Sequence, residues 1–392
     1  AQGMPWRTEP EIGDERQQFL TRRRAITPEI ETDTYPFRDV ALCRADVEWL
    51  LATHEAGGRR GPVDAKLTGP ERRDGLDLRG ANLRDADLTF LPMACTIGGL
   101  SLDEQLPNPE ELPRRIEAAA VHMEGARLRN TDLRAAPMRG AHLEGAYLRY
   151  AHLEGTRLQG AHLQGANLVR AWFIRDNNLE GLSLGDANHG YATLVDVEWG
   201  GVNLAVVDWS QMKMLGDEQA ARQSPSVRGD PASKVKRLNQ YMAAVRANRQ
   251  LATLLRAQTL NEDADRFFYR SQLLQRRVLR LQGHYARAFG SWLLGLIAGY
   301  GYKPLRSVIT YLLVVGAFAV AYFLLGGTVH PPLGLLGSMV FSITSFHGRG
   351  FAPGENVLIT NPLTIIAAVE AIIGLLIEIT FIATFTQRFF AR

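Results

Sequence analysis

Residues 141–170 read AHLEGAYLRYAHLEGTRLQGAHLQGANLVR, a stretch that repeats itself every five positions. Leucine holds the third position of each pentapeptide, and alanine holds the first position in most of them. A period of five matches neither the 3.6-residue period of a helix nor the two-residue period of a flat strand. The chain must therefore wind as a coil in which each repeat turns one large and one small side chain inward.

The same pattern extends well beyond this stretch. It begins with GLDLRGANLRDADLTF at residues 75–90, is interrupted over 91–120, and resumes at Met123. These pentapeptides, among them ANLRD, ADLTF and AHLQG, resemble the pentapeptide-repeat family. The resemblance implies a right-handed quadrilateral β-helix with four repeats per coil over 71–215. Because the spacing slips by one residue between Phe173 and Leu179, we predict a bulge near Asn177 and, after it, an interior position for His189.

The segments that flank or interrupt the repeat are assigned structural roles. Residues 1–70 are interpreted as an N-terminal arm and cap, extended and charged as far as residue 35 and followed by a short helix at Ala45–Ala52. Repeat folds need such caps at their open ends. The interruption, 91–120, is predicted to contain a helix that leaves one corner of the coil. It is either a plain surface excursion or a binding site for an unknown cytoplasmic protein or ligand.

No catalytic, cofactor or metal site is predicted. His122, His142 and His162 lie twenty residues apart and would form one outward column, but we expect solvated surface there because no carboxylate or thiol is recognised in the column. Cys43 and Cys95 have no metal-ligand spacing. The 44 basic and 41 acidic residues nearly balance, which argues against nucleic acid as a partner. We also find no nucleophile–base group or phosphate-binding loop, so an enzyme is the least favoured class.

A helical connector is predicted to follow, over 216–289, as two amphipathic helices. Arginines at 276, 277, 280 and 287 crowd its end, and cationic residues just before a span mark the cytoplasmic side of a membrane. Residues 290–306 are apolar and aromatic but too short to cross a bilayer, so we expect an interfacial helix that contacts membrane lipid.

The last part of the chain, 307–392, is a candidate membrane domain. Apolar runs at 307–327 and 362–386 each have about the 20 residues that a helix needs to cross the hydrocarbon core. Between them, 333–354 begins as a half-length apolar segment and becomes small and polar, as a re-entrant pore loop does. This domain resembles the two-transmembrane pore module of the potassium-channel superfamily, and its second span contains the matching stretch VEAIIGLL at 369–376. The resemblance implies a homotetramer around one axis.

Site residues follow from this resemblance. The predicted selectivity filter comprises Thr344, Ser345, Phe346, His347, Gly348, Arg349 and Gly350, which departs from the family's T-V-G-Y-G. Gly374 is placed at the gating hinge, and Glu370 is expected to support the filter. Glu378, Ile382 and Phe385 are assigned to the pore cavity. Since eight residues turn a helix by about 80°, Glu370 and Glu378 need not share a face.

These features predict an ion channel with a cytoplasmic pentapeptide-repeat regulatory domain. A ring of Glu378 carboxylates favours cations and a ring of Arg349 favours anions, so a weakly selective cation channel and an anion-permeable channel both remain open. The other alternative is a membrane-anchored oligomeric scaffold whose repeat domain binds a partner. We expect a multi-pass protein of the bacterial inner membrane with the repeat domain and both termini in the cytoplasm.

Overall fold

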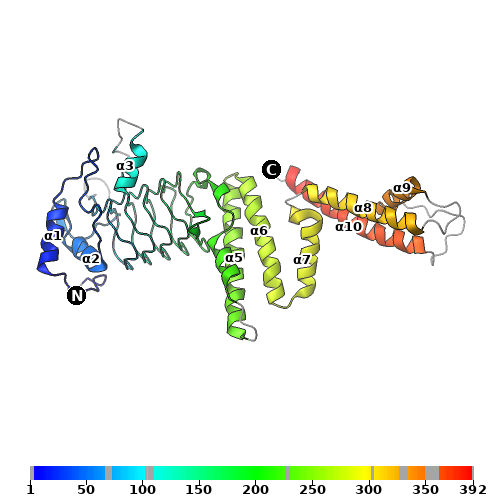
Figure 1. Ribbon diagram of the computed structural model, residues 1–392, viewed down its shortest axis with the longest axis horizontal. Helices are drawn as coiled ribbons and strands as arrows, with labels where there is room; N and C mark the ends of the chain where they lie inside the picture. The colour runs from blue at the N-terminus through cyan, green and yellow to red at the C-terminus, as the bar shows by residue number, and fades with distance from the viewer. Residues whose placement is uncertain are drawn as a thin grey trace. The chain divides into compact units, whose positions relative to one another are not determined.

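A computed structural model describes residues 4–66, 73–101, 104, 110–225, 230–301, 304–325, 334–348 and 362–390. The chain divides into two compact units, Ala1–Ser271 and Gln272–Arg392, which are described separately. The first unit holds a stack of coils between two helical ends, and the second is entirely helical in its described part (Figure 1).

The N-terminal cap consists of two helices and a small hairpin. Helix α1 (Asp14–Arg24) buries Leu20 completely, and α2 (Arg44–Thr53) lies where the sequence predicts a capping helix. Strands β1 (Glu55–Ala56) and β2 (Arg59–Arg60) pair antiparallel. The prediction of an extended arm through residue 35 is wrong. Its high charge hides α1, which docks on the core through the buried Leu20 and the partly buried Phe19.

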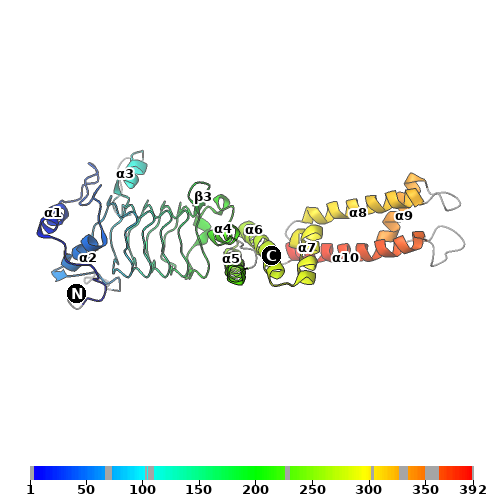
Figure 2. The same cartoon turned by 60° about the horizontal axis from the view of Figure 1, so that its bottom comes forward.

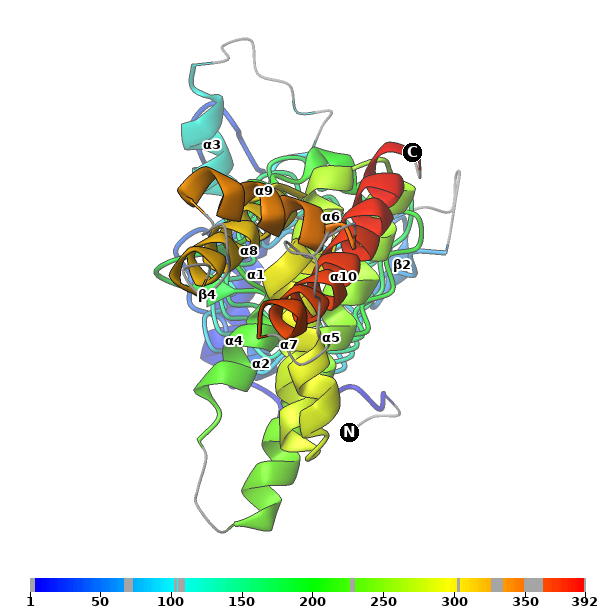
Figure 3. The same ribbon diagram turned by 90° about the vertical axis from the view of Figure 1, so that its right-hand side faces the viewer.

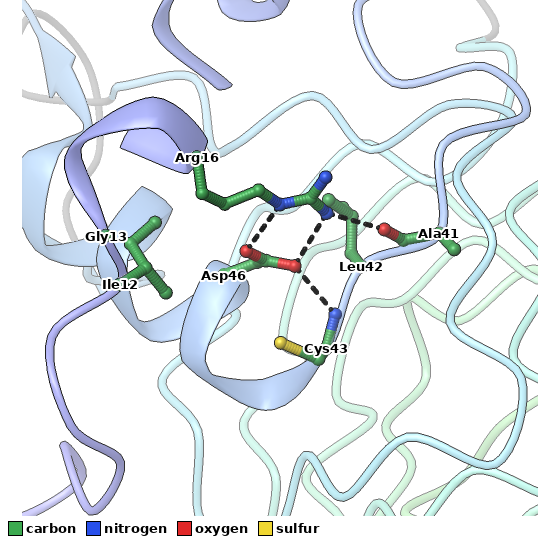
Figure 4. A pocket seen from close by; sticks show the side chains of 7 residues that line it. All are labelled: Ile12, Gly13, Arg16, Ala41, Leu42, Cys43 and Asp46. Carbon is green, nitrogen blue, oxygen red and sulfur yellow. Dashed lines mark hydrogen bonds and ion pairs between the residues drawn. The ribbon is translucent and has the colours of Figure 1, made fainter. Parts of the chain in front are cut away.

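An ion pair joins the two cap helices (Figure 4). The Arg16 guanidinium donates to both carboxylate oxygens of Asp46, at 3.0 and 2.8 Å, and to the Ala41 carbonyl. The Cys43 backbone N–H also donates to Asp46 and caps α2. Burial alone would raise the pKa of Asp46, but the hydrogen bonds from Arg16 and Cys43 outweigh it and hold that pKa below its ordinary value.

Parallel backbone bridges join the coils of the first unit, and in the uninterrupted stretch from His122 to Trp172 the bridged residues are twenty positions apart, which is four pentapeptides. His122, for example, is bridged to His142, and His142 to His162. The leucines at the third positions and the alanines at the first are buried, and they form one continuous core with the cap. Figures 1 and 2 show the resulting stack of coils. The periodicity therefore predicted this β-helix correctly.

The interruption starts later than the sequence suggested. Residues through Ile97 remain in the coil, since Pro92 is bridged to Asp132 and Ile97 to Asp77. The pattern fails here because Gly98 takes a leucine position: a Cβ at residue 98 would lie 2.4 Å from the Met138 sulfur, which fills the space instead. Helix α3 (Leu112–Ala119) then stands out from one corner (Figure 2).

The predicted bulge lies at Asn177, which is buried. Its amide nitrogen donates to the carbonyls of Leu153 and Thr156, and its Oδ1 accepts from the Ile174 backbone N–H. Beyond it, the bridged partners are 21 residues apart and then 26, because a hairpin of β3 (Gly185–Asp186) and β4 (Gly190–Tyr191) is inserted. The interior position predicted for His189 is wrong. It lies in the hairpin turn, with 55% of its side chain exposed and its ring against Asp186.

Helices close the C-terminal end of the coils. Two short 3₁₀ turns, η2 (Leu204–Val206) and η3 (Trp209–Gln211), lead into α4 (Gly216–Gln223) and α5 (Pro231–Ala257). Gln258, just after α5, accepts from the Leu204 N–H and donates to the Val202 carbonyl, so it satisfies backbone groups of the last coil. Helix α6 (Asn261–Leu281) begins in this unit and packs Phe267 edge-on against Trp209.

A buried carboxylate at this end predicts a pH effect. Asp217, 5% exposed, accepts a 2.7 Å hydrogen bond from the Leu194 N–H, and burial raises its pKa to about 6. Since that pKa lies above the unfolded value, the folded state holds the extra proton between about pH 4 and 6. We expect the stability of the first unit to fall as pH rises through that window and to be level above it.

The test is Asp217→Asn in the full-length protein, followed by Trp199 and Trp209 fluorescence on heating. The neutral amide should remove this pH dependence and raise stability at pH 7.5 by up to about 3 kcal/mol. Asp208→Asn is the opposite control, because hydrogen bonds from Ser210 and Gln211 lower the pKa of this exposed carboxylate. A pH profile that is unchanged in Asp217→Asn would contradict the prediction.

The second unit contains α7 (Tyr285–Ala298), a 3₁₀ turn η4 (Gly299–Gly301), α8 (Pro304–Leu325), α9 (Leu335–Phe346) and α10 (Pro362–Phe390). Helix α7 starts before the predicted boundary at residue 290, so Tyr285 and Phe289 belong to it. Segments at 305–325 and 363–383 are long and apolar enough to cross a membrane, each with a mean hydropathy of 2.4. Helix α9 is apolar but too short to do so.

Candidate functional site: the contact between α9 and α10

The half-length helix α9 is packed against both long helices, α8 and α10 (Figure 3). Six residues make the contacts between the α9 side and α10 that we call the α9–α10 seam. They are Ser342, Phe346 and His347 on the α9 side and Glu370, Gly374 and Glu378 on α10. The three α10 residues follow one another at intervals of four positions, and all three contact the α9 side, so they lie on the same face of α10.

Glu370 links the three helices. It is fully buried, and one carboxylate oxygen accepts from the Tyr322 hydroxyl of α8 at 2.7 Å. The other accepts from the Ser342 hydroxyl of α9 at 2.5 Å. In a hydrocarbon environment no water would replace these partners, so the carboxylate and both hydroxyls depend on each other. Glu370 thus lies against α9, the helix that precedes the predicted filter.

At Gly374 the backbones of α9 and α10 approach each other closely. A Cβ at this position would lie 2.0 Å from the Phe346 carbonyl oxygen, far inside van der Waals contact. Phe346 is itself buried, with its ring edge-on to Tyr311 at 4.8 Å and Ile377 in the same apolar cluster. The glycine that was predicted as a hinge is therefore also a site of close backbone packing.

Beyond Phe346, the α9 side ends in a contact between a histidine and a carboxylate. The Nδ1 atom of His347 lies against a carboxylate oxygen of Glu378, and both side chains are partly exposed in the single chain. The next residue, Gly348, lies in the turn that ends α9. Its φ is +67°, and its N–H donates to the Ser345 carbonyl. Glycine suits this left-handed conformation.

Part of the predicted filter is helical. Thr344, Ser345 and Phe346 lie inside α9, and the Thr344 hydroxyl is turned back to the Val340 and Phe341 carbonyls. Arg349 and Gly350 are outside the described residues.

The other predicted site residues lie on α10. Ile382 is 63% exposed in the single chain, and Phe385 lies in the helix, with its side chain outside the described set. The sequence reading missed Tyr322 and Ser342, the partners of Glu370. A serine and a tyrosine inside apolar helices are weak signals on their own, and only the packing of α8, α9 and α10 brings them together.

Comparisons with known proteins bear on the coils. A family model described as pentapeptide repeats matches residues 119–149 and 136–173, in eight copies. Similar solved structures include a trypsin-treated form of QnrB1, a plasmid-mediated fluoroquinolone resistance protein. It is 13% identical, with a TM-score of 0.18, over 38% of this chain and 85% of that one. No curated protein matches the chain.

Two cyanobacterial structures are also similar. HetL, a pentapeptide repeat protein involved in heterocyst differentiation regulation in Nostoc sp. strain PCC 7120, is 30% identical, with a TM-score of 0.12, over 32% of this chain and 55% of that one. Rfr23 from Cyanothece 51142 is 25% identical, with a TM-score of 0.15, over 32% of this chain and 88% of that one. The matched residues are thus pentapeptide repeats, the sequence class of right-handed β-helices. The same chain carries two apolar helices of membrane-spanning length.

Proposed function

We propose that this protein is a tetrameric, potassium-channel-like ion channel, cation-permeable and weakly selective, with a pentapeptide-repeat regulatory domain. The α9–α10 seam is the observation that carries the proposal. A half-length apolar helix is held between two membrane-length helices by a fully buried carboxylate, and its polar end contacts a second carboxylate. Ionisable groups inside membrane segments generally serve function, because they are costly to place there.

The surfaces of α8 and α10 support a membrane location and further subunits. Only 17% of each apolar window is buried within the single chain. Side chains such as Leu312, Leu313, Ile372 and Leu375 are more than half exposed, which is unfavourable in water. Lipid and neighbouring copies around a central axis would cover them. The arginines at 276, 277 and 280, just before the membrane unit, favour a cytoplasmic first unit.

The proposal is tested by reconstituting the purified protein in liposomes. We expect cation flux and, in single-channel recordings with asymmetric KCl, a reversal potential displaced toward that of potassium. A displacement toward the chloride potential would favour the anion-permeable alternative. The complete absence of flux from reconstituted oligomers would favour a membrane-anchored scaffold, whose apolar helices only assemble and anchor it.

Neutralising Glu378 is predicted to reduce cation conductance. Glu378 lies at the polar end of α9, against His347, and a ring of such carboxylates concentrates cations in a pore. Glu378→Gln keeps the size of the side chain while removing its charge. We expect a several-fold lower single-channel conductance at low salt and a smaller difference at high salt, where screening weakens the charge.

The matched control is His347→Gln, which removes the partner of the same contact and leaves the carboxylate in place. Its conductance should be closer to that of the unaltered protein. An equal conductance for Glu378→Gln and the unaltered protein at low salt would remove Glu378 from the conduction path.

A further inference from the structure

The outward histidine column of the β-helix has carboxylate neighbours that the sequence reading did not recognise. The rings of His122 and His142 are stacked at 4.7 Å between centroids, and those of His142 and His162 at 5.0 Å. Glu124 and Glu144 lie two positions after the first two histidines. Side chains two apart on a strand point to the same side, so each glutamate lies beside its histidine.

Three of these residues form a compact group. One ligand atom from each of His122, Glu124 and His142 lies within 4.8 Å of the other two. The Nδ1 atom of His122 is 3.2 Å from Oε1 of Glu124, and that of His142 is 3.3 Å from Oε1 of Glu144. The side chains of His122 and Glu124 are each 25% exposed, and that of His142 is 15% exposed. The three-residue group is therefore sheltered but within reach of solvent.

Part of the ligand capacity of this group is unused. The second carboxylate oxygen, Oε2, of both Glu124 and Glu144 is buried and makes no hydrogen bond in the described structure. A buried carboxylate oxygen without a donor is unfavourable. A bound cation would satisfy it.

We propose that His122, Glu124 and His142 bind a divalent transition-metal ion, for which Zn²⁺ is the best match. Two imidazole nitrogens and one carboxylate oxygen are a typical three-ligand set for zinc, with a fourth position left for water. Such nitrogen-rich sites prefer Zn²⁺, Ni²⁺ or Cu²⁺ to Mg²⁺ or Ca²⁺. The proposal is independent of the channel, since all three ligands lie in the β-helix.

Two neighbouring residues set the conditions for binding. The Arg84 guanidinium donates to Oε1 of Glu124 and lies 3.0 Å from Nδ1 of His122, so a cationic group already contacts two of the three ligands. Half of the Arg84 side chain is exposed, which allows it to swing into solvent when the metal binds. Glu117 of α3, largely exposed, lies 3.1 Å from Nε2 of His142 and adds negative charge beside the site.

The site would join two successive coils close to the base of α3. His122 and His142 belong to neighbouring coils, and α3 ends at Ala119, three residues before His122. Metal binding therefore stabilises the folded first unit by mass action, because the unfolded chain does not hold the three ligands together.

The experiment is zinc titration of the full-length protein in detergent after treatment with a chelator, by calorimetry and by equilibrium dialysis. We expect one tight equivalent per chain. His142→Ala should weaken it by more than about 100-fold, since even the loss of an outer partner of a metal ligand costs 10–100-fold. His122→Ala should do the same, and Arg84→Gln should tighten binding because the competing cation is removed.

The matched control is His152→Ala. His152 lies in an identical AHLEG pentapeptide, with its Nδ1 3.2 Å from Glu154, but its column neighbours are Asp132 and Trp172 rather than histidines. It should leave zinc binding unchanged. Unfolding of each variant without zinc checks that the coil is intact, and cobalt absorption reports the ligand set independently of affinity.

Three results would overturn the proposal. They are the lack of a tight equivalent in the unaltered protein, equal losses in His142→Ala and His152→Ala, and a cobalt spectrum without nitrogen ligation.

Discussion

Gly374→Ala is expected to destabilise the second unit and to abolish the ion flux of the proposed channel. The added Cβ would lie 2.0 Å from the Phe346 carbonyl oxygen, and a backbone carbonyl cannot rotate away as a flexible side chain can. Overpacking of this kind typically costs about 1–3 kcal/mol and moves the contacting backbone. Here the backbone that moves is the C-terminal end of α9, immediately before His347 and the remaining filter residues. We expect a lower thermal stability in detergent and no flux in liposomes.

Gly316→Ala is the matched control, because it also adds one methyl group to a glycine inside an apolar helix. A Cβ at Gly316 has no atom within 4 Å in the single chain, and alanine favours a helix by about 1 kcal/mol over glycine. It should therefore keep or raise stability. If Gly374 were a hinge alone, Gly374→Ala would change gating while leaving stability equal to that of Gly316→Ala. That pattern would reject the packing argument.

Removing the carboxylate of Glu370 is expected to have the second large effect. In Glu370→Ala the Ser342 hydroxyl keeps an alternative acceptor, the Val315 carbonyl oxygen at 2.9 Å. Tyr322 is fully buried and loses the acceptor of its hydroxyl. An unsatisfied buried hydroxyl costs about 1–3 kcal/mol. We expect a loss of stability of that size, with loosening of α9 and reduced flux.

A double-mutant cycle with Tyr322→Phe isolates this contact. Tyr322→Phe alone should destabilise the protein by about 1–3 kcal/mol, because it leaves one carboxylate oxygen of the buried Glu370 without a donor. In the Glu370→Ala background the same change should be neutral or stabilising, since it removes the unsatisfied hydroxyl. The difference is the coupling energy of the pair, measured from thermal or chemical unfolding in detergent. Additive effects would mean that Tyr322 and Glu370 do not depend on each other.

Features defined by neighbouring residues, such as a short repeat or an apolar run, could be predicted from the sequence. The five-residue repeat predicted the coil, the leucines of its core and the bulge at Asn177, because each repeat meets the same neighbours twenty residues away. The two apolar runs predicted α8 and α10, because length and hydropathy alone define a candidate span. Glu144 and Glu154 were overlooked as neighbours of His142 and His152, although the His-x-Glu spacing of AHLEG puts both side chains on one side of the strand.

The contacts that matter most depend on residues far apart in the chain. Glu370, Gly374 and Glu378 were assigned separate roles, yet all three contact the α9 side, and nothing local in α10 indicates which face α9 will cover. The helical state of Thr344 and Ser345 follows from the docking of Phe346 against Gly374. The sequence by itself determined the repeat, the two helices of membrane-spanning length and the half-length helix, because periodicity and hydropathy act along the chain. Only the tertiary structure decided the α9–α10 seam, because its geometry arises where three helices separated by loops pack together.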